Sequence, residues 1–323
     1  MKILIYNSGG GLGDSIQLFD LITTLKEKYG EEQLYYLSAH NNHFNSSLKK
    51  YNNQLKELKT GLIYFGFRLW HLFFPKKKIL KDNFIDKFHL IIDLQSKFRN
   101  TIILKQFPCD NFYSSTFNFK FCNIRNNYLS SKYEIKNIIL NIEKLLNTKI
   151  QYVKYDINKI DPIYFDEAKR LLPSKNYIGF SITQGNKYRK KSWPLEKFIN
   201  VAKEITNKNK TPVFFIEKEN MELINKIKKE IKNALFPELE TVLSGPPLVS
   251  ALSTRLEKAI SIDNGIMHMI GLANIPMIVL FGPTDSKKFA PKINKIDILD
   301  SNSIYNSSDI SKISENDVLN LIK

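Results

Sequence analysis

Four glycines and an aspartate near the start of the chain are of types and spacing that could do chemistry. They lie in the stretch SGGGLGDSIQ (residues 8–17), which follows a short apolar run, and Asp14 comes directly after Gly13. Backbone without side chains could bind a phosphate or a dinucleotide, and the neighbouring carboxylate could be a catalytic base. The stretch is not a P-loop, because no lysine follows the glycines. Dinucleotide binding is disfavoured, because that fingerprint has a different glycine spacing and an acid at the end of the second strand.

Asp14 could have either of two roles. An aspartate beside a glycine turn often caps the following helix, because its carboxylate accepts hydrogen bonds from the first backbone amides. The end of the first apolar run is also where open α/β sheets place their ligands, and there Asp14 could act as a general base. The glycines would let another molecule approach the backbone closely. The stretch alone leaves both interpretations open.

A second group of candidate residues lies in the middle of the chain. Lys187, Arg189, Lys190 and Lys191 cluster just before a predicted helix that has Pro194 in its first turn. Cations at a helix N-terminus disfavour the helix unless an anion binds there. A basic loop exposed to solvent is the alternative.

The stretch SIDNGIMH (residues 261–268) forms a third group. It follows an apolar run and leads into a predicted helix. Gly265, at the start of that helix, would leave backbone N–H groups accessible to a diphosphate. His268 comes three residues later, where a structural role is the alternative to a role in the anion site.

The elements that must position these groups follow an α/β pattern, in which short apolar runs alternate with amphipathic stretches. A polar, proline-containing linker at 156–176 separates two series of predicted strands. The strands are expected near 2–7, 33–38 and 89–94, and then near 177–183, 211–217, 241–244, 258–263 and 276–281. A last helix is expected near 309–322. The sequence therefore predicts two domains, 1–160 and 161–323.

The composition is typical of a soluble globular protein, with 43% hydrophobic and 25% charged residues. The formal net charge is +16, but only six of the 48 basic residues are arginine. Because nucleic-acid-binding surfaces rely strongly on arginine, no nucleic-acid partner is expected, and an anionic small molecule or membrane surface fits the charge. Two cysteines without metal-ligand spacing, and an apolar start too short for a signal peptide, favour the cytoplasm.

The aromatic and basic segment LIYFGFRLWHLFFPKKK (residues 62–78) stands outside the α/β pattern. Arg68 and His71 interrupt it, and it is too short to span a bilayer. It could pack on the first domain as part of the core, or its aromatic face and terminal lysines could lie on a membrane surface. A helix that docks a partner protein is a third interpretation.

Four motifs together resemble glycosyltransferase family 9, the heptosyltransferases of the lipopolysaccharide inner core. They are GLGD after the first apolar run, KxWP at the mid-chain helix, DNGxMH before VLFGPTD, and LIIDLQSKFRNTIIL at 90–104, which is similar to the family's DLQG segment. The order of the motifs matches over nearly the whole chain. The resemblance implies the GT-B fold, an α/β fold of two Rossmann-like domains that face each other across a cleft. The N-terminal domain would bind the acceptor and the C-terminal domain the nucleotide sugar.

The resemblance also implies roles for single residues. Asp14 would be the general base that takes the proton from the acceptor hydroxyl, and Lys191 would neutralise the leaving nucleotide diphosphate. The residues expected to contact the donor are Gly13, Thr183, Lys191, Trp193, Glu217, Asp263, Asn264, Gly265 and His268. Glu219 and Glu222 are alternatives to Glu217 as the ribose ligand.

The implied reaction is transfer of a sugar with inversion at the anomeric carbon. The donor would be a nucleotide sugar, usually ADP-heptose in the family, and the acceptor an anionic lipid-linked saccharide. Lys97 and Arg99 could bind this acceptor or be surface charges. The sequence has no D-x-D pair, so a metal ion is not expected, nor is another cofactor. Alternatives are a transferase of another nucleotide sugar, a GT-B nucleotide-sugar epimerase, and a non-enzymatic nucleotide or nucleic-acid binding protein.

The chain departs from the family pattern at four places, one of which is the turn FFIEKENME (residues 214–222) that holds the three candidate ribose ligands. Asn7 stands where members commonly carry a basic residue, the glycine loop is one residue longer, and Asn264 replaces the usual Thr or Ser. These departures bear on the identity of the donor sugar more than on the predicted fold. The expected location is cytoplasmic, with peripheral contact to the inner face of the cytoplasmic membrane as an option.

Overall fold

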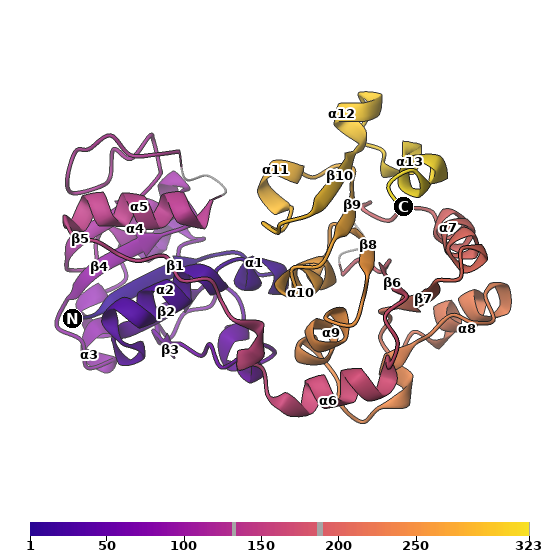
Figure 1. Cartoon of the computed structure of the whole chain (residues 1–323). Coiled ribbons are helices and arrows are strands. Elements are labelled where there is room, and N and C mark those ends of the chain that lie inside the picture. Colours follow the sequence, from indigo (N-terminus) through magenta and orange to yellow (C-terminus); the bar gives the residue numbers. More distant parts are fainter. Residues whose placement is uncertain (131–133, 186–189, 323) are drawn as a thin grey trace. The chain divides into compact units, whose positions relative to one another are not determined.

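The computed structural model describes residues 1–130, 134–185 and 190–322. The chain forms two compact units, Met1–Asp156 and Ile157–Lys323. Each unit contains one five-stranded parallel sheet with helices packed against it (Figure 1). Two such α/β units are the architecture that the alternating apolar runs predict, whereas the sequence placed the division at 160/161.

The strands of the first unit lie in the order β3-β2-β1-β4-β5. Their bounds are β1 Ile3–Asn7, β2 Leu34–Ser38, β3 Lys56–Glu57, β4 Phe88–Asp93 and β5 Cys109–Ser114. The central strand β1 is buried along its whole length because β2 and β4 flank it, with Ile3 opposite both Leu34 and Leu90. The strand order reverses between β1 and β4. In open α/β sheets a ligand binds at the carboxyl ends of two such strands.

The helices of the first unit are α1 Leu12–Ile16, α2 Phe19–Tyr29, α3 Lys76–Asp82, α4 Phe98–Leu104 and α5 Ile135–Leu146. One core cluster joins strand residues such as Tyr6 and Phe88 to Phe65 and Ile103. Phe65 belongs to the aromatic segment predicted from the sequence, so part of that segment does pack in the core. The segment is not one helix: it holds the 3₁₀ turn η4 (Leu69–Leu72) and the start of α3.

The second unit repeats the plan with the order β10-β9-β8-β6-β7. Its strands are β6 Tyr177–Ser181, β7 Thr211–Phe214, β8 Lys258–Ile262, β9 Met277–Phe281 and β10 Ile296–Asp300. Its helices are α6 Pro162–Leu171, α7 Leu195–Asn207, α8 Met221–Glu230, α9 Pro246–Ser253, α10 Gly265–Leu272, α11 Ser286–Phe289, α12 Ser301–Tyr305 and α13 Glu315–Leu319. The strand order reverses between β6 and β8, which places the expected ligand site at their carboxyl ends.

Two predicted elements are wrong. Residues 241–244 form no strand: Val242 is almost fully exposed there, and Gly245 and two prolines follow at once. The last predicted helix is instead the 3₁₀ turn η8 (Ile310–Lys312) and the short helix α13, because Ser314 starts a new helix by capping the Asp317 N–H. In the described residues, every helix falls short of the length and apolarity that crossing a membrane would require.

Candidate active site

The glycine loop after β1 places Asp14 in the first turn of α1. Gly11 is the N-cap residue of α1, and Asp14 Oδ2 accepts a hydrogen bond from its N–H at 3.2 Å, the return bond of a capping box. Among the described residues no hydrogen bond reaches Oδ1, which leaves that oxygen available to an acceptor hydroxyl. The two roles predicted for Asp14 are therefore compatible. Gly13 is buried in the same first turn.

The loop itself is held by close packing and by polar contacts. A Cβ on Gly9 would lie 2.8 Å from the Cβ of Asp14, and one on Gly10 would lie 2.6 Å from the ring of His40. Both positions therefore require glycine. The Asn7 side chain accepts a hydrogen bond from the Gly9 N–H at 3.0 Å, which gives a structural role to the residue that departs from the family pattern.

The carboxyl end of β4 carries a buried carboxylate that we did not single out from the sequence. Asp93 Oδ1 accepts from the N–H groups of Gln95 and Ser96 at 3.0 and 3.2 Å. Its Oδ2 accepts from the hydroxyls of Thr101 and Ser114 at 2.6 and 2.8 Å. Burial raises the pKa of Asp93, and these hydrogen bonds partly offset that rise. Asp93 therefore holds the loop that follows β4. An acid at the end of an apolar run, as in LIID, is a sequence signal from which this role could have been predicted.

The loop that Asp93 holds leads to the two predicted acceptor-binding residues. Lys97 is exposed at the N-terminus of α4, and the guanidinium carbon of Arg99 lies 5.6 Å from the centre of the Phe67 ring. Ser96 has φ +53°, a left-handed conformation that favours glycine and explains the glycine of the family segment. Both cations thus follow β4, and Asp14 follows the neighbouring strand β1.

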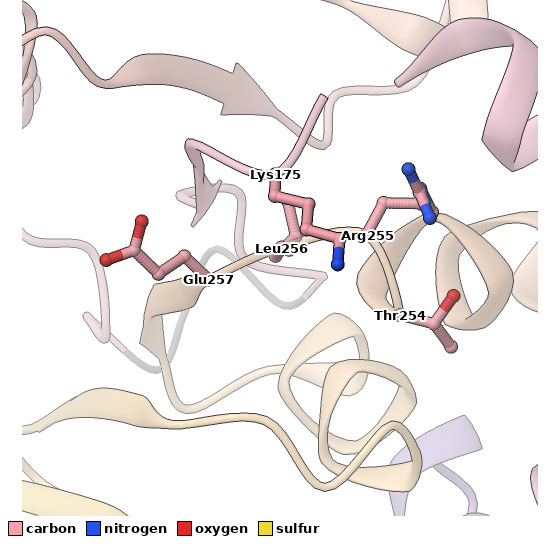
Figure 2. A pocket seen from close by; sticks show the side chains of 5 residues that line it. All are labelled: Lys175, Thr254, Arg255, Leu256 and Glu257. Carbon is pink, nitrogen blue, oxygen red and sulfur yellow. The ribbon is translucent and has the colours of Figure 1, made fainter. Parts of the chain in front are cut away.

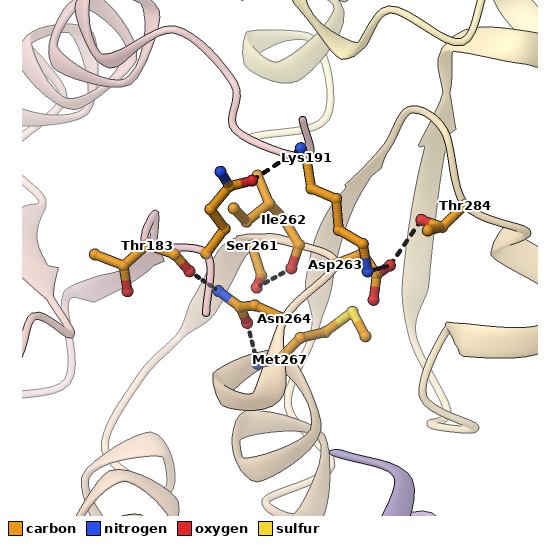
Figure 3. A network of polar contacts seen from close by, with 9 residues as sticks. Thr183, Lys191, Ser261, Ile262, Asp263, Asn264, Met267 and Thr284 are labelled. Carbon is orange, nitrogen blue, oxygen red and sulfur yellow. Dashed lines mark hydrogen bonds and ion pairs between the residues drawn. The ribbon is translucent and has the colours of Figure 1, made fainter. Parts of the chain in front are cut away.

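In the second unit, Lys191 and Asp263 form an ion pair at the carboxyl end of β8 (Figure 3). The two side chains are only 12% and 7% exposed. The Thr284 hydroxyl donates to the same Asp263 oxygen at 2.7 Å, and the Lys191 N–H donates to Gln184 Oε1 at 2.9 Å. Asp263 therefore holds the Lys191 ammonium, Thr284 holds Asp263, and Gln184 holds the Lys191 backbone.

Asn264 joins β6 to α10 beside this ion pair. Its side-chain N–H₂ donates to Ser181 Oγ at 2.7 Å and to the Thr183 carbonyl at 2.8 Å, and its Oδ1 accepts from the Met267 N–H at 2.8 Å (Figure 3). Asn caps a helix as well as Ser or Thr does. The replacement at this position therefore preserves the cap and adds the link to β6.

The first turn of α10 opens at this cluster. Helix geometry leaves the N–H groups of Gly265 and Ile266 without acceptors inside the helix, and Asn264 caps only Met267. Such a terminus suits an anion. His268 is buried in the same helix, and both roles predicted for it remain open.

Trp193 requires a correction. It is 2% exposed, its ring lies edge-on to Phe198 with the centres 4.8 Å apart, and its indole N–H donates to the Ile313 carbonyl at 2.9 Å. A side chain buried in this way has no surface for a donor, so Trp193 anchors the loop that carries Lys191. The predicted cations Lys187 and Arg189 lie outside the described residues, while Lys190 is exposed.

The three candidate ribose ligands follow β7. Glu217 and Glu219 are exposed just beyond the strand, whereas the Glu222 carboxylate accepts a hydrogen bond from Lys226 at 2.7 Å in α8. An exposed ion pair of this kind is weak, so all three remain predicted ribose ligands, with Glu217 first. Glu238, in a 3₁₀ turn nearby, has its pKa raised to about 7 by burial and by the charge of Glu217.

The raised pKa of Glu238 predicts a pH-dependent stability. Between its ordinary value of 4.5 and about 7, the folded state keeps a proton on Glu238 that the unfolded state releases. The free energy of unfolding contributed by this group therefore falls as the pH rises through that window. We expect Glu238→Gln to remove a fall of about 1 to 3 kcal/mol between about pH 5 and about pH 8. Urea unfolding measures it, with the exposed Glu240→Gln as control, and an unchanged pH profile would contradict the assignment.

A pocket of about 430 Å³ lies away from these residues. Its lining, shown in Figure 2, is Lys175, Thr254, Arg255, Leu256 and Glu257. Lys175 precedes β6 and Glu257 precedes β8, so the pocket lies at the amino ends of the strands. Ligands of open α/β sheets bind at the opposite ends, and we assign the pocket no role.

Comparison with known families decides the class of this site. The model of glycosyltransferase family 9 (heptosyltransferase) matches residues 85–319. The chain belongs to glycosyltransferase family 9. It is therefore a glycosyltransferase, and the matched range includes Asp93, Lys191 and Asp263 but neither Asp14 nor the aromatic segment.

Solved structures share the fold of this glycosyltransferase. The family 9 glycosyltransferase from Veillonella parvula is 18% identical, with a TM-score of 0.67 over 99% of this chain and 95% of that one. E. coli heptosyltransferase WaaC with ADP is 13% identical, with a TM-score of 0.66 over 100% and 99% of the chains. E. coli ADP-heptose lipopolysaccharide heptosyltransferase II is 15% identical, with a TM-score of 0.63 over 100% and 97%. The predicted GT-B fold with two Rossmann-like units is confirmed. The search of curated proteins found no matching sequence.

The predicted residues of the glycosyltransferase thus fall into separate groups. Lys191, Asp263, Asn264, Gly265 and the Thr183 backbone gather where β6 and β8 end. In the first unit, Asp14 follows β1, and Lys97 and Arg99 follow β4. Both groups lie where the strand order of their sheet reverses, which is the expected place for ligands.

Proposed function

We propose that this glycosyltransferase transfers heptose from ADP-heptose to an anionic lipid-linked saccharide of the lipopolysaccharide core. The cluster of Lys191, Asp263 and Asn264 at the start of α10 is the observation that carries the proposal, because it combines a fixed cation with open helix amides. The heptosyltransferase family match supports the sugar. ADP and ADP-heptose in the names of the two E. coli relatives support the nucleotide.

The donor diphosphate would bind at the cation and the helix terminus. Lys191 and the N–H groups of Gly265 and Ile266 would neutralise its charge, which grows as the glycosidic oxygen leaves. The diphosphate would compete with Asp263 for the ammonium. Asp263 would keep its hydrogen bond from Thr284 and could accept one from a sugar hydroxyl. Thr183 would approach the phosphates, Glu217 the ribose, and Gly13 would allow the donor close to the backbone.

The acceptor would bind to the N-terminal unit. Asp14 would take the proton from its hydroxyl as the acceptor oxygen bonds to the anomeric carbon and the bond to the diphosphate breaks. This displacement inverts the anomeric centre and is proposed to proceed without a metal ion. Lys97 and Arg99 would hold the negative charge of the acceptor. We propose a cytoplasmic location at the membrane that carries this lipid-linked substrate.

A screen by thermal unfolding tests the donor. ADP is expected to raise the Tm by several degrees, as would any ligand at about 100 times its Kd, whereas UDP and GDP are not. Incubation with ADP-heptose alone should leave the sugar unchanged, and adding the lipid-linked acceptor should consume it. Selective stabilisation by UDP would contradict the ADP donor, and conversion of the sugar without acceptor would indicate an epimerase.

A further inference from the structure

The aromatic loop, defined as residues 62–74 of the first unit, presents five large apolar or aromatic side chains to solvent. They are Ile63, 82% exposed, Tyr64, 45%, Leu69, 63%, Trp70, 52%, and Phe73, 88%. A group of exposed apolar side chains close together in the chain marks an interaction surface. The aromatic loop precedes the range matched by the family model, so the family pattern does not account for it.

Buried residues of the same loop hold these side chains in place. The Phe65 carbonyl accepts a hydrogen bond from the buried Tyr6 hydroxyl at 2.9 Å. The Gly66 N–H donates to Nδ1 of buried His71 at 2.9 Å, and His71 stacks on Phe65 with the ring centres 5.5 Å apart. The Lys76 ammonium, also buried, donates to the His71 carbonyl. The exposed side chains therefore belong to an ordered, anchored loop.

The charges around the loop have one sign. From Leu58 to Lys81 the sequence has no Asp or Glu, but it has six basic residues, Lys59, Arg68, Lys76, Lys77, Lys78 and Lys81. Arg68, Lys77 and Lys78 are exposed, and within the part of the chain that the structure describes none of the three pairs with a carboxylate. The surface therefore suits a partner that is both apolar and negatively charged.

The aromatic loop borders the candidate acceptor site. The His40 ring lies 4.7 Å from Tyr64 and 5.9 Å from Phe67, measured between ring centres, and packs against Gly10 of the glycine loop. Phe67 also lies beneath the Arg99 guanidinium. A surface that binds the aromatic loop is thereby brought next to the residues proposed to bind the acceptor.

We propose that the aromatic loop docks the enzyme on an anionic phospholipid bilayer. Leu69, Trp70 and Phe73 enter the interface, and Arg68, Lys77 and Lys78 meet the lipid phosphates. The proposal rests on the proposed function for its purpose, which is to bring a lipid-linked acceptor to Asp14. Its test uses neither donor nor acceptor, so the two can fail separately.

Co-sedimentation with vesicles of phosphatidylcholine, alone or mixed with phosphatidylglycerol, measures the docking. The full chain is expected to prefer the mixed vesicles. Trp70→Ser/Phe73→Ser should lower the partition coefficient about 10- to 100-fold. Lys77→Gln/Lys78→Gln should lower it about 10-fold and remove most of the preference for phosphatidylglycerol.

Matched controls come from exposed residues of the second unit. Ile163→Ser removes a half-exposed apolar side chain, and Lys169→Gln/Lys229→Gln removes two exposed charges; neither should change partitioning. Thermal unfolding of each variant shows that it is folded.

Tryptophan fluorescence gives an independent readout, because Trp70 and the buried Trp193 are the only two tryptophans. Vesicles should shift the emission to shorter wavelength, and Trp70→Phe should abolish the shift while partitioning persists. Wild-type-like partitioning of a folded Trp70→Ser/Phe73→Ser variant would overturn the proposal. A dimer that this variant dissociates, without vesicle binding by the wild type, would overturn it in favour of a second copy of the chain.

Discussion

Replacing Asp14 by Asn is expected to lower kcat for sugar transfer by about 10²- to 10⁴-fold, the usual contribution of a general base. The amide is nearly isosteric with the carboxylate, and its oxygen can still accept the Gly11 N–H that caps α1. The Asp14→Asn variant therefore keeps the local structure, but its side chain can no longer accept the proton of the acceptor hydroxyl. Asp14→Ala removes the hydrogen bond from the Gly11 N–H as well and should cost about 1 kcal/mol of stability.

Single-turnover transfer with saturating ADP-heptose measures the effect. Nucleotide affinity, followed by calorimetry with ADP, should be the same for Asp14→Asn and wild type, because the residues proposed to hold the diphosphate and the ribose, Lys191, Gly265 and Glu217, lie in the second unit and the substitution leaves the backbone of Gly13 unchanged. Near-normal turnover of a folded Asp14→Asn variant would exclude Asp14 as the base and leave it only the capping role.

Replacing Lys191 by Met is expected to weaken ADP binding and to lower the rate of transfer by about 10²- to 10³-fold. Asp263 pairs with this ammonium beside the open turn of α10, and Gln184 holds the Lys191 backbone through its N–H. A charge held in advance stabilises the leaving diphosphate without the cost of reorganising at the moment of reaction. Unchanged ADP affinity would remove Lys191 from the phosphate site.

The Lys191 variant also leaves the carboxylate of Asp263 buried without its cation, which destabilises the fold. A matched double variant separates the two effects. Lys191→Met/Asp263→Asn should recover most of the lost stability in urea unfolding, because no unpaired charge remains. Its ADP affinity should stay low. Recovery of both properties together would mean that Lys191 acts only through folding.

The sequence predicted interior strands better than edge strands. β1, β4, β6, β8 and β9 are continuous apolar runs because sheet neighbours and helices cover them, and each was found. The three missed strands, β3, β5 and β10, all lie at sheet edges. Edge strands are half-solvated and tolerate polar residues, as in CDNFYS and IDILD, so they lack the apolar run that marks a strand.

The aromatic segment shows a second limit. Its composition left core packing and membrane contact as separate interpretations. In the structure Phe65 and His71 are buried while Trp70 and Phe73 are exposed, so one short loop supplies both surfaces. Because the segment is not a regular helix, its apolar residues show no helical periodicity, and the sequence does not indicate which side chains are buried.

By itself, the sequence determined two α/β units, the motifs that follow their strands, and the glycines that the first loop requires. These properties are local, because they depend on apolar periodicity and on the backbone freedom of single residues. Only the tertiary structure decided which side chains meet. Lys191 and Asp263 are 72 positions apart and pair because parallel strands bring their carboxyl ends to one edge. Tertiary packing also buries Trp193 in the core of the second unit. In the first unit it brings four hydrogen-bond donors to the carboxylate of Asp93.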